Sequence, residues 1–272
     1  MTRFVVVPQW QGSPSARAMQ LIDGAEAIAG DLPRSSTVRV EVPAEAGEAL
    51  DTGIRRFSTL ERVSAAIGAA LDEGDAAESA LVIGGDCGVA VPAIAAAAAR
   101  HERLAVVWCD AHGDLHTADS SPSGAFGGMA LRAVAEAGTF PGSGAVPAER
   151  IILVGAREFD DGERDAATDL GITHLPVTDL ADPGALAAAV AATGADAVYV
   201  HVDLDVLDPA VLAGLGMPVP FGLSLDELVA AVRALRAEVP LVGGSLSGFA
   251  PASPAAAVDD LGTILRIVGA LA

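Results

Sequence analysis

The stretch Cys109-Asp110-Ala111-His112-Gly113-Asp114-Leu115-His116 places polar residues at alternate positions directly after an apolar run, residues 104–108. Such a run is typical of a strand that is buried on both faces. Alternate side chains of an extended chain point to the same side, so Asp110, His112 and Asp114 can converge on one point. Carboxylates and imidazoles are common metal ligands. The stretch therefore predicts a metal site at the end of a central strand.

A second polar cluster, His201-Val202-Asp203-Leu204-Asp205, follows another apolar run at residues 197–200. If the two clusters meet, their crowded carboxylates repel one another, which raises their pKa values unless a cation lies between them. A divalent metal ion is the simplest such cation. His201 has the same facing as Asp203 and Asp205. His201 could therefore donate a hydrogen bond to a metal ligand, but a histidine at such a position is more commonly an ordinary core residue.

Strand-like runs alternate with helix-like segments along the whole chain, about eight of each, with no linker and no internal repeat. This alternation predicts an α/β fold over residues 1–272 as a single domain, with a mainly parallel sheet covered by helices on both faces. We expect strands at residues 4–7, 37–42, 80–83, 104–109, 151–154, 174–177, 197–204 and 241–248. We expect helices at residues 16–30, 54–72, 91–100, 129–137, in a segment ending at 170, and at 182–193, 224–238 and 258–271.

Local signals refine three helix ends. Ser224-Leu225-Asp226-Glu227 reads as a capping box. Gly30 suits a left-handed helix end, and Ser58 or Thr59 is a plausible N-cap. In a parallel sheet, ligands bind beyond the carboxyl ends of the strands, and the polar clusters at residues 86–87, 110–116, 157–163 and 203–208 all follow predicted strands.

Composition narrows the classes of partner. The chain of 272 residues has a formal charge of −20 and contains no basic run, which argues against nucleic acid or an anionic membrane as partner. Two cysteines give no disulfide framework and indicate a reducing compartment. No segment reaches the roughly 20 apolar residues that a membrane helix needs, and the N-terminus runs straight into a predicted strand without a leader. We therefore expect a soluble, cytoplasmic protein.

Three motifs together resemble the signature of the ureohydrolase superfamily, which includes arginase, agmatinase and formimidoylglutamase. They are Gly84-Gly85-Asp86, the segment Asp110-Ala111-His112-Gly113-Asp114, and Asp203-Leu204-Asp205-Val206-Leu207-Asp208-Pro209. The resemblance implies a three-layer α/β/α arginase-like fold, two manganese ions bridged by a hydroxide, a small guanidino substrate, and a homo-oligomer, a trimer or hexamer. The donor set agrees, because carboxylates with one or two nitrogens suit Mn²⁺.

The resemblance also assigns the metal ligands. It makes Asp110 and Asp203 the residues that bridge both ions. It gives Asp114 and the position of Cys87 to the first ion, and His112 with Asp205 to the second. It further implies catalytic roles for Asp114 and His116. The alternative for the carboxylates is an acidic, solvated surface at the strand ends.

Further positions match the family's substrate contacts. Asp160 and Glu163 correspond to carboxylates that hold the substrate's α-amino group, although acidic residues also suit an ordinary helix N-terminus. Ser123 and His116 correspond to residues that contact the α-carboxylate. His116 stands in place of the usual Asn and can still donate a hydrogen bond.

Three residues depart from the family pattern. Cys87 replaces a histidine ligand, so it either binds as a thiolate, which favours zinc, or is a small buried residue without a metal contact. The first metal site is therefore expected to be weak or empty. Gly127 stands where arginases carry a histidine thought to move protons. Gly248 stands where the family carries a glutamate that pairs with the substrate guanidinium, and losing one member of a buried ion pair costs about 3–5 kcal/mol.

The sequence thus predicts a manganese-dependent hydrolase of a linear C–N bond, acting on arginine, Nω-hydroxy-arginine or a related guanidino compound and releasing urea or a substituted urea. Cys87 together with Gly-Gly-Met at residues 127–129 resembles the Nω-hydroxy-arginine branch. A hydroxyguanidine is less basic than a guanidine and needs a carboxylate at position 248 less. The alternative is a catalytically silent member of the fold with a metal-binding or regulatory role.

Overall fold

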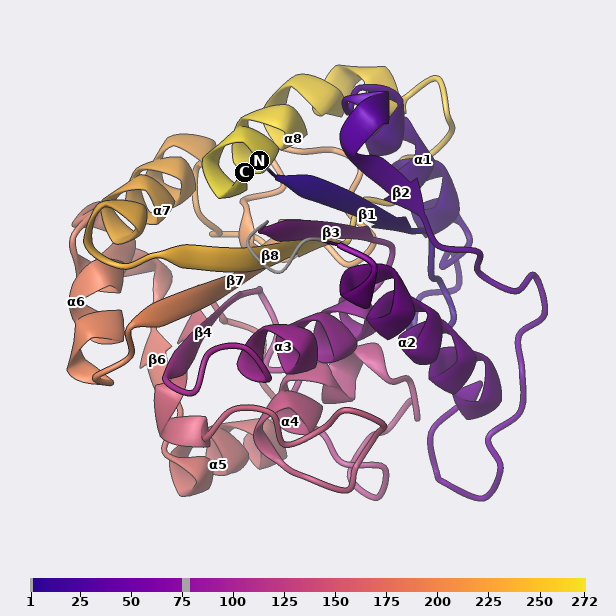
Figure 1. Cartoon of the computed structure of the whole chain (residues 1–272), viewed down its shortest axis with the longest axis horizontal. Coiled ribbons are helices and arrows are strands. Elements are labelled where there is room, and N and C mark those ends of the chain that lie inside the picture. The colour runs from indigo at the N-terminus through magenta and orange to yellow at the C-terminus, as the bar shows by residue number, and fades with distance from the viewer. Residues whose placement is uncertain (1, 75–78) are drawn as a thin grey trace.

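One parallel sheet of eight strands organises the computed structural model, which describes residues 2–74 and 79–272 (Figure 1). The strand order is β2-β1-β3-β8-β7-β4-β5-β6, and every recorded strand pair is parallel. The strands are β1 (Arg3–Val7), β2 (Thr37–Arg39), β3 (Ala80–Gly84), β4 (Leu104–Cys109), β5 (Ile151–Val154), β6 (Thr173–Leu175), β7 (Ala197–Asp203) and β8 (Leu241–Ser247).

Eight α-helices cover the two faces of the sheet within the described ranges (Figure 1). One face carries α1 (Gln20–Gly30), α6 (Ala185–Ala192), α7 (Leu225–Glu238) and α8 (Ala257–Leu271). The other carries α2 (Phe57–Asp72), α3 (Ala90–Ala98), α4 (Ala130–Ala135) and α5 (Asp161–Leu170). The predicted three-layer α/β/α fold with a parallel sheet of about eight strands is confirmed.

The central strand β4 is apolar throughout because both of its faces are buried. In β4, Ala105 and Val107 pack into the core beneath α1, α6, α7 and α8, whereas Val106 and Trp108 pack into the core beneath α2 to α5. All six residues of β4 are buried. The polar residues that follow this strand come only beyond its end, where Asp110 begins the first cluster.

The order of the strands opens a crevice at the carboxyl ends of β3, β8, β7 and β4. The chain passes from β3 to β4, continues outward to β5 and β6, and then returns to insert β7 and β8 between them. Where the strand order reverses in this way, the connections on either side leave the sheet in opposite directions. In open α/β sheets, ligands bind at that point.

Several helix ends differ from the prediction. Helix α1 begins at Gln20, not Ala16, because the Ser15 hydroxyl accepts the Arg17 N–H and holds this segment in a turn. Helix α1 ends at Gly30 as predicted, but the left-handed cap is absent, because Asp31 follows in a right-handed conformation. Helix α2 follows Arg56, which has left-handed backbone angles and no side-chain cap. Its guanidinium packs over Trp10, so a tertiary contact decides this start.

The predicted capping box of α7 is present. The Ser224 hydroxyl accepts the Glu227 N–H at 3.3 Å, and the Glu227 carboxylate accepts the Ser224 N–H at 2.9 Å.

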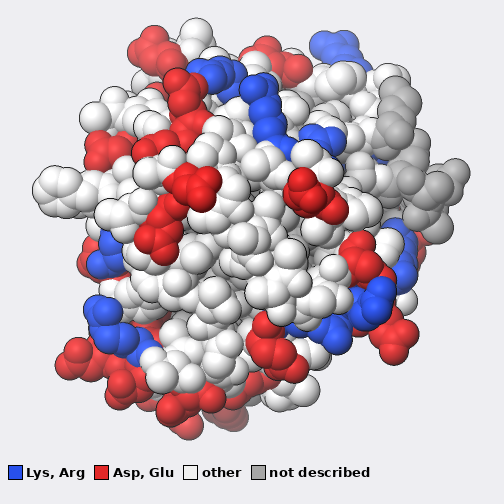
Figure 2. All heavy atoms as spheres, turned by 90° about the vertical axis from the view of Figure 1, so that its left-hand side faces the viewer, with Lys and Arg blue, Asp and Glu red and all other residues white. Residues whose placement is uncertain are grey.

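Acidic groups on the face viewed in Figure 2 surround a largely uncharged centre, and the basic groups there lie near acidic ones. Among the described residues, ion pairs such as Arg103–Asp196 and Arg266–Asp226 engage some of the few arginines. None of the described helices combines the length and the apolarity that crossing a lipid bilayer requires.

Candidate metal centre

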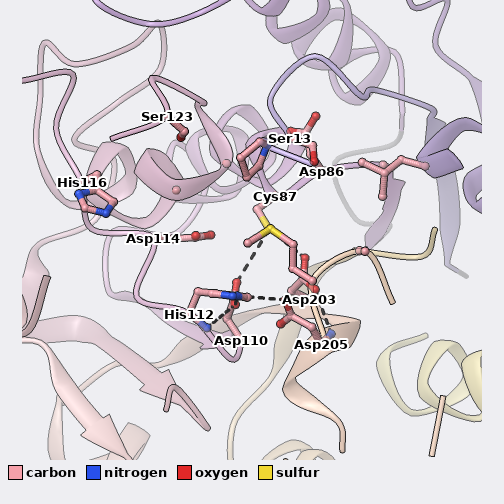
Figure 3. A pocket seen from close by; sticks show the side chains of 18 of the residues that line it. Ser13, Asp86, Cys87, Asp110, His112, Asp114, His116, Ser123, Asp203 and Asp205 are labelled. Atoms are coloured by element: carbon pink, nitrogen blue, oxygen red, sulfur yellow. Dashed lines mark hydrogen bonds and ion pairs between the residues drawn. The ribbon is translucent and has the colours of Figure 1, made fainter. Parts of the chain in front are cut away.

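A cavity of about 290 Å³ lies in the crevice at the carboxyl ends of the central strands (Figure 3). Polar residues of both sequence clusters form one part of its lining, and small or apolar residues form another. The polar part comprises Ser13, Asp86, Cys87, Asp110, His112, Asp114, His116, Ser123, Glu163, Asp203 and Asp205. The remainder comprises Pro14, Leu21, Gly85, Pro122, Gly127, Gly128, Gly216, Met217 and Gly248.

Asp110, His112 and Asp205 form a group of ligand atoms that lie within 4.8 Å of one another. Nδ1 of His112 lies 3.0 Å from Oδ2 of Asp205 and 3.4 Å from Oδ1 of Asp110. Backbone donors fix the carboxylates, since Asp205 Oδ1 accepts the Ala111 N–H and Asp110 Oδ1 accepts the His112 N–H. Two carboxylates and one imidazole that converge in this way form a donor set that suits a hard divalent cation.

The charges of this group are out of balance without a cation. Burial, and then the charge of Asp110, raise the pKa of Asp205. Burial disfavours a charged His112, but hydrogen bonds and charges from Asp110 and Asp205 more than offset it and raise its pKa to about 12. The group therefore holds a proton where a metal ion would otherwise supply the positive charge.

Asp114 adds a carboxylate that is not satisfied within the described chain. Its Oδ2 is buried and has no hydrogen-bond partner. Its backbone has a φ of 52°, a strained conformation that clusters at functional sites. Burial, followed by repulsion from Asp110, raises its pKa well above the usual value. An orphaned carboxylate oxygen beside the Asp110 group fits a bound cation, so the residues present fit a metal ion.

Asp203 faces the thiol of Cys87. Sγ of Cys87 lies 3.0 Å from Oδ2 of Asp203, and 3.8 Å from Oδ2 of Asp110. Burial, and then the charges of Asp203, Asp114 and Asp110, raise the pKa of the thiol well above its ordinary value. Cys87 is therefore a neutral donor to Asp203 in this arrangement.

A second group of candidate ligands, Cys87, Asp110 and His201, is already hydrogen-bonded. His201 is fully buried, and its Nδ1 lies 2.7 Å from the Ser245 hydroxyl. Burial lowers the pKa of His201 to about 3, so the ring is neutral. The structure shows a histidine with polar partners next to the ligands, rather than one surrounded only by apolar side chains.

His116 lies at a different part of the cavity from Cys87 (Figure 3), and it contacts the two predicted substrate carboxylates. Its Nε2 is 3.1 Å from Asp160 Oδ2 and 3.9 Å from Glu163 Oε1. Asp160 and Glu163 also form the capping box of α5, so each has a structural role in addition to any contact with substrate. Ser123 lines the cavity, and its hydroxyl accepts the Ala125 N–H.

The two glycine departures have physical reasons. Gly248 has a φ of 86°, and a Cβ there would lie 2.2 Å from Oδ1 of Asp203. Gly127 donates its N–H to the Gly12 carbonyl, and a Cβ there would lie 3.1 Å from the same oxygen. The present backbone therefore excludes a side chain at position 248 and leaves little room for one at position 127.

Some residues of the site were not evident from the sequence. Leu21 and Met217 line the cavity from α1 and from the loop before α7, and no local pattern marks them. Ser245 and Ser247 carried a weak signal, since they alternate along an otherwise apolar strand. Asp86 of the first motif holds the loop after β1 by accepting hydrogen bonds from Gln9 and Gly12, and it also accepts the Gly88 N–H of its own segment.

Comparison with protein-family models matches the chain to the arginase family over residues 21–259. Among curated proteins, an arginase of Bacillus caldovelox is 32% identical over 212 residues, covering 73% of this chain and 68% of that protein. Other arginases, such as that of Brevibacillus brevis at 36% identity, align over about half of their own length, here 53%.

Solved structures show the same fold. An arginase of Entamoeba histolytica in complex with L-ornithine has a TM-score of 0.85 at 22% identity, covering 99% of this chain and 97% of that chain. The proclavaminate amidino hydrolase of Streptomyces clavuligerus has a TM-score of 0.74 at 23% identity, covering 99% and 90%. At these identities the likeness establishes the fold.

Proposed function

Since this chain belongs to the arginase family of ureohydrolases, we propose that it hydrolyses a linear C–N bond of an amidine or guanidine with manganese as cofactor. The observation that carries the proposal is the convergence of Asp110, His112 and Asp205 beside the orphaned Oδ2 of Asp114. Family membership also supports a homo-oligomer and a small-molecule substrate.

Asp110, His112, Asp203 and Asp205 would hold the tighter metal ion. When bound, a divalent ion lowers the pKa of water and stabilises the negative charge that develops during hydrolysis. The other side of the centre, at Cys87, is the weaker site in this proposal. Its thiol is neutral and already donates to Asp203, so binding a second ion there requires the loss of that proton.

Asp114 is the residue best placed to handle a proton. Its buried Oδ2 has no hydrogen-bond partner within the described chain, and Asp114 lines the cavity, so this carboxyl group can take up and release a proton there. When water adds to the amidine carbon and the C–N bond breaks, the leaving nitrogen must gain a proton. We assign that transfer to Asp114, which would take up the proton released by the attacking water and pass it to the leaving nitrogen, since Gly127 has no side chain to do so.

The wall near position 248 favours an amidine end of low basicity. Gly248 offers no carboxylate to a bound substrate. The cavity lining near it also includes Leu21, Gly216 and Met217, which carry no charge. These residues belong to one wall, because Gly216 approaches Ala250 and α1 packs against Phe249 through Gly24. A hydroxyguanidine carries less positive charge than a guanidinium, so Nω-hydroxy-arginine fits this wall better than arginine.

Hydrolysis of a substrate panel tests the proposal. Metal-free protein would be loaded with Mn²⁺ and incubated with arginine, agmatine and Nω-hydroxy-arginine, and urea and hydroxyurea would be measured by mass spectrometry. We expect hydroxyurea from Nω-hydroxy-arginine, and loss of both metal and turnover in Asp110→Asn. Metal binding without turnover of any guanidino compound would support the metal-binding or regulatory alternative instead.

A further inference from the structure

Two carboxylates of the metal centre are held on one side by donors that the proposed function leaves unused. Oδ2 of Asp203 accepts a hydrogen bond of 2.9 Å from the Ser247 hydroxyl. Oδ2 of Asp110 accepts one of 3.2 Å from the Trp108 indole N–H. His112 approaches Asp110 through the opposite oxygen, Oδ1, so the donors do not compete with it.

His201 contacts both of these donors. Its ring packs against Trp108 with centroids 3.9 Å apart and an interplanar angle of 37°. Its Nε2 lies 3.5 Å from the Ser247 hydroxyl, a long hydrogen bond, and its Nδ1 lies 2.7 Å from the Ser245 hydroxyl. His201, Ser245 and Ser247 are all at most 1% exposed, so water does not compete for these bonds.

The hydrogen bonds that run from Ser245 through His201 and Ser247 to Asp203 can all point in one direction. The Ser247 hydroxyl donates to Oδ2 of Asp203, so the Ser247 oxygen is free to accept from Nε2–H of His201. A neutral ring with its proton on Nε2 must accept at Nδ1, where the Ser245 hydroxyl donates. Each donor in such an aligned chain polarises the next, which strengthens the bond at Asp203.

We propose that Ser247 and His201 are positioning residues, which fix the Oδ2 atoms of Asp203 and, through Trp108, of Asp110. The remaining lone pairs of both carboxylates are then presented to the metal ion in a fixed orientation. This inference rests on the proposed metal site. Partners of metal ligands outside the coordination sphere contribute about 10–100-fold to metal affinity when they orient a ligand.

The first measurement is Mn²⁺ affinity by calorimetry, with four variants. Ser247→Ala removes the donor to Asp203, Ser247→Thr keeps a hydroxyl there, and Ser245→Ala removes the donor to His201. Ser64→Ala is the matched control, because Ser64 is buried in α2 but does not line the cavity. We expect Ser247→Ala to weaken binding by about 10–100-fold, Ser245→Ala to weaken it less, and the other two to stay near the wild type.

A second measurement requires no metal. In metal-free protein labelled with ¹⁵N-histidine and held at pH 9, above the pKa of about 7 of Asp203, His201 should be the neutral Nε2–H tautomer. Its resonances should be identified by their loss in His201→Gln. The Nδ1–H tautomer would overturn the proposal, because the Ser247 proton would then point to the ring and not to Asp203. This readout decides the matter even where Ser247→Ala folds poorly.

The outcomes separate this inference from the proposed function. Wild-type Mn²⁺ affinity in Ser247→Ala would overturn the positioning role whether or not the enzyme turns over any substrate. Equal weakening in Ser247→Ala and Ser64→Ala would also overturn it, since a general packing loss would explain both. A selective loss in Ser247→Ala, restored in Ser247→Thr, would support it even if no guanidino compound were hydrolysed.

Discussion

The thiol of Cys87 occupies the position on which the number of bound metal ions depends. It donates to Asp203 at 3.0 Å, and burial keeps it protonated. A protonated thiol neutralises no carboxylate, and a thiolate would add a negative charge to a centre that already holds Asp110, Asp114, Asp203 and Asp205. A neutral imidazole at this position would bring a nitrogen ligand without either cost.

Cys87→His should therefore raise the manganese content from about one to about two ions per chain, because the weaker site gains a neutral nitrogen donor. Metal analysis and calorimetric titration of both proteins would measure the change. Cys109→Ala is the control, since Cys109 is the other buried cysteine and packs into the core beneath α1 and α6 to α8. Two equally tight sites in the wild type would show that Cys87 does not weaken the centre.

At the scale of elements, α1 brings Leu21 to the cavity by packing directly on the segment after β8. Gly24 permits this approach, because a Cβ there would lie 2.0 Å from the Phe249 carbonyl oxygen. The neighbouring residue Gly248 begins the same segment. The fit of one helix on one turn thus positions part of the cavity wall.

Gly24→Ala should destabilise the protein by about 1–3 kcal/mol, since α1 must move away from Phe249. Gly30→Ala in the same helix is the matched control: nothing lies within 4 Å of its added Cβ, and we expect a gain of about 0.5–1 kcal/mol. Thermal and denaturant unfolding of both variants would test this. Similar effects of the two substitutions would refute the close approach of α1.

Spacing within single elements predicted much of the site, and packing between elements decided the rest. Asp110, His112 and Asp114 follow one strand at alternate positions, and this spacing alone predicts that they converge. Leu21 reaches the cavity only because α1 packs on Phe249, which no local pattern encodes. The start of α2 was mispredicted for the same reason, since the Arg56–Trp10 contact joins residues distant in sequence.

For the molecule as a whole, the buried acidic centre links folding to pH. Asp203 has a pKa of about 7, raised first by burial and then by Asp205, and Asp114 is raised well above 3.8. His112 is raised from 6.5 to about 12. Each group binds a proton more tightly in the folded chain than in the unfolded one, so its contribution to stability declines as pH rises through the window between the two values.

Metal-free protein should therefore lose thermal stability between pH 6.5 and pH 8.5. His201, whose pKa is lowered to about 3, acts in the opposite direction only below its unfolded value of 6.5. Saturating Mn²⁺ should restore more stability at the higher pH, because the metal ion replaces the lost protons. A free Mn²⁺ concentration of 100 times Kd adds about 2.7 kcal/mol to the free energy of unfolding. Melting curves with chelator or Mn²⁺ would test this, and a chelated protein that melts higher at pH 8.5 would contradict it.

The central claim is that metal bound by Asp110, His112, Asp203 and Asp205 makes this chain a hydrolase. The most direct measurement is the rate of urea or hydroxyurea release plotted against the amount of Mn²⁺ bound per chain. We predict that the rate rises from zero in the chelated protein and reaches its plateau as the tighter site fills, and that Asp205→Asn shows no such rise. A rate that does not depend on bound metal, or no turnover with the site filled, would contradict the claim.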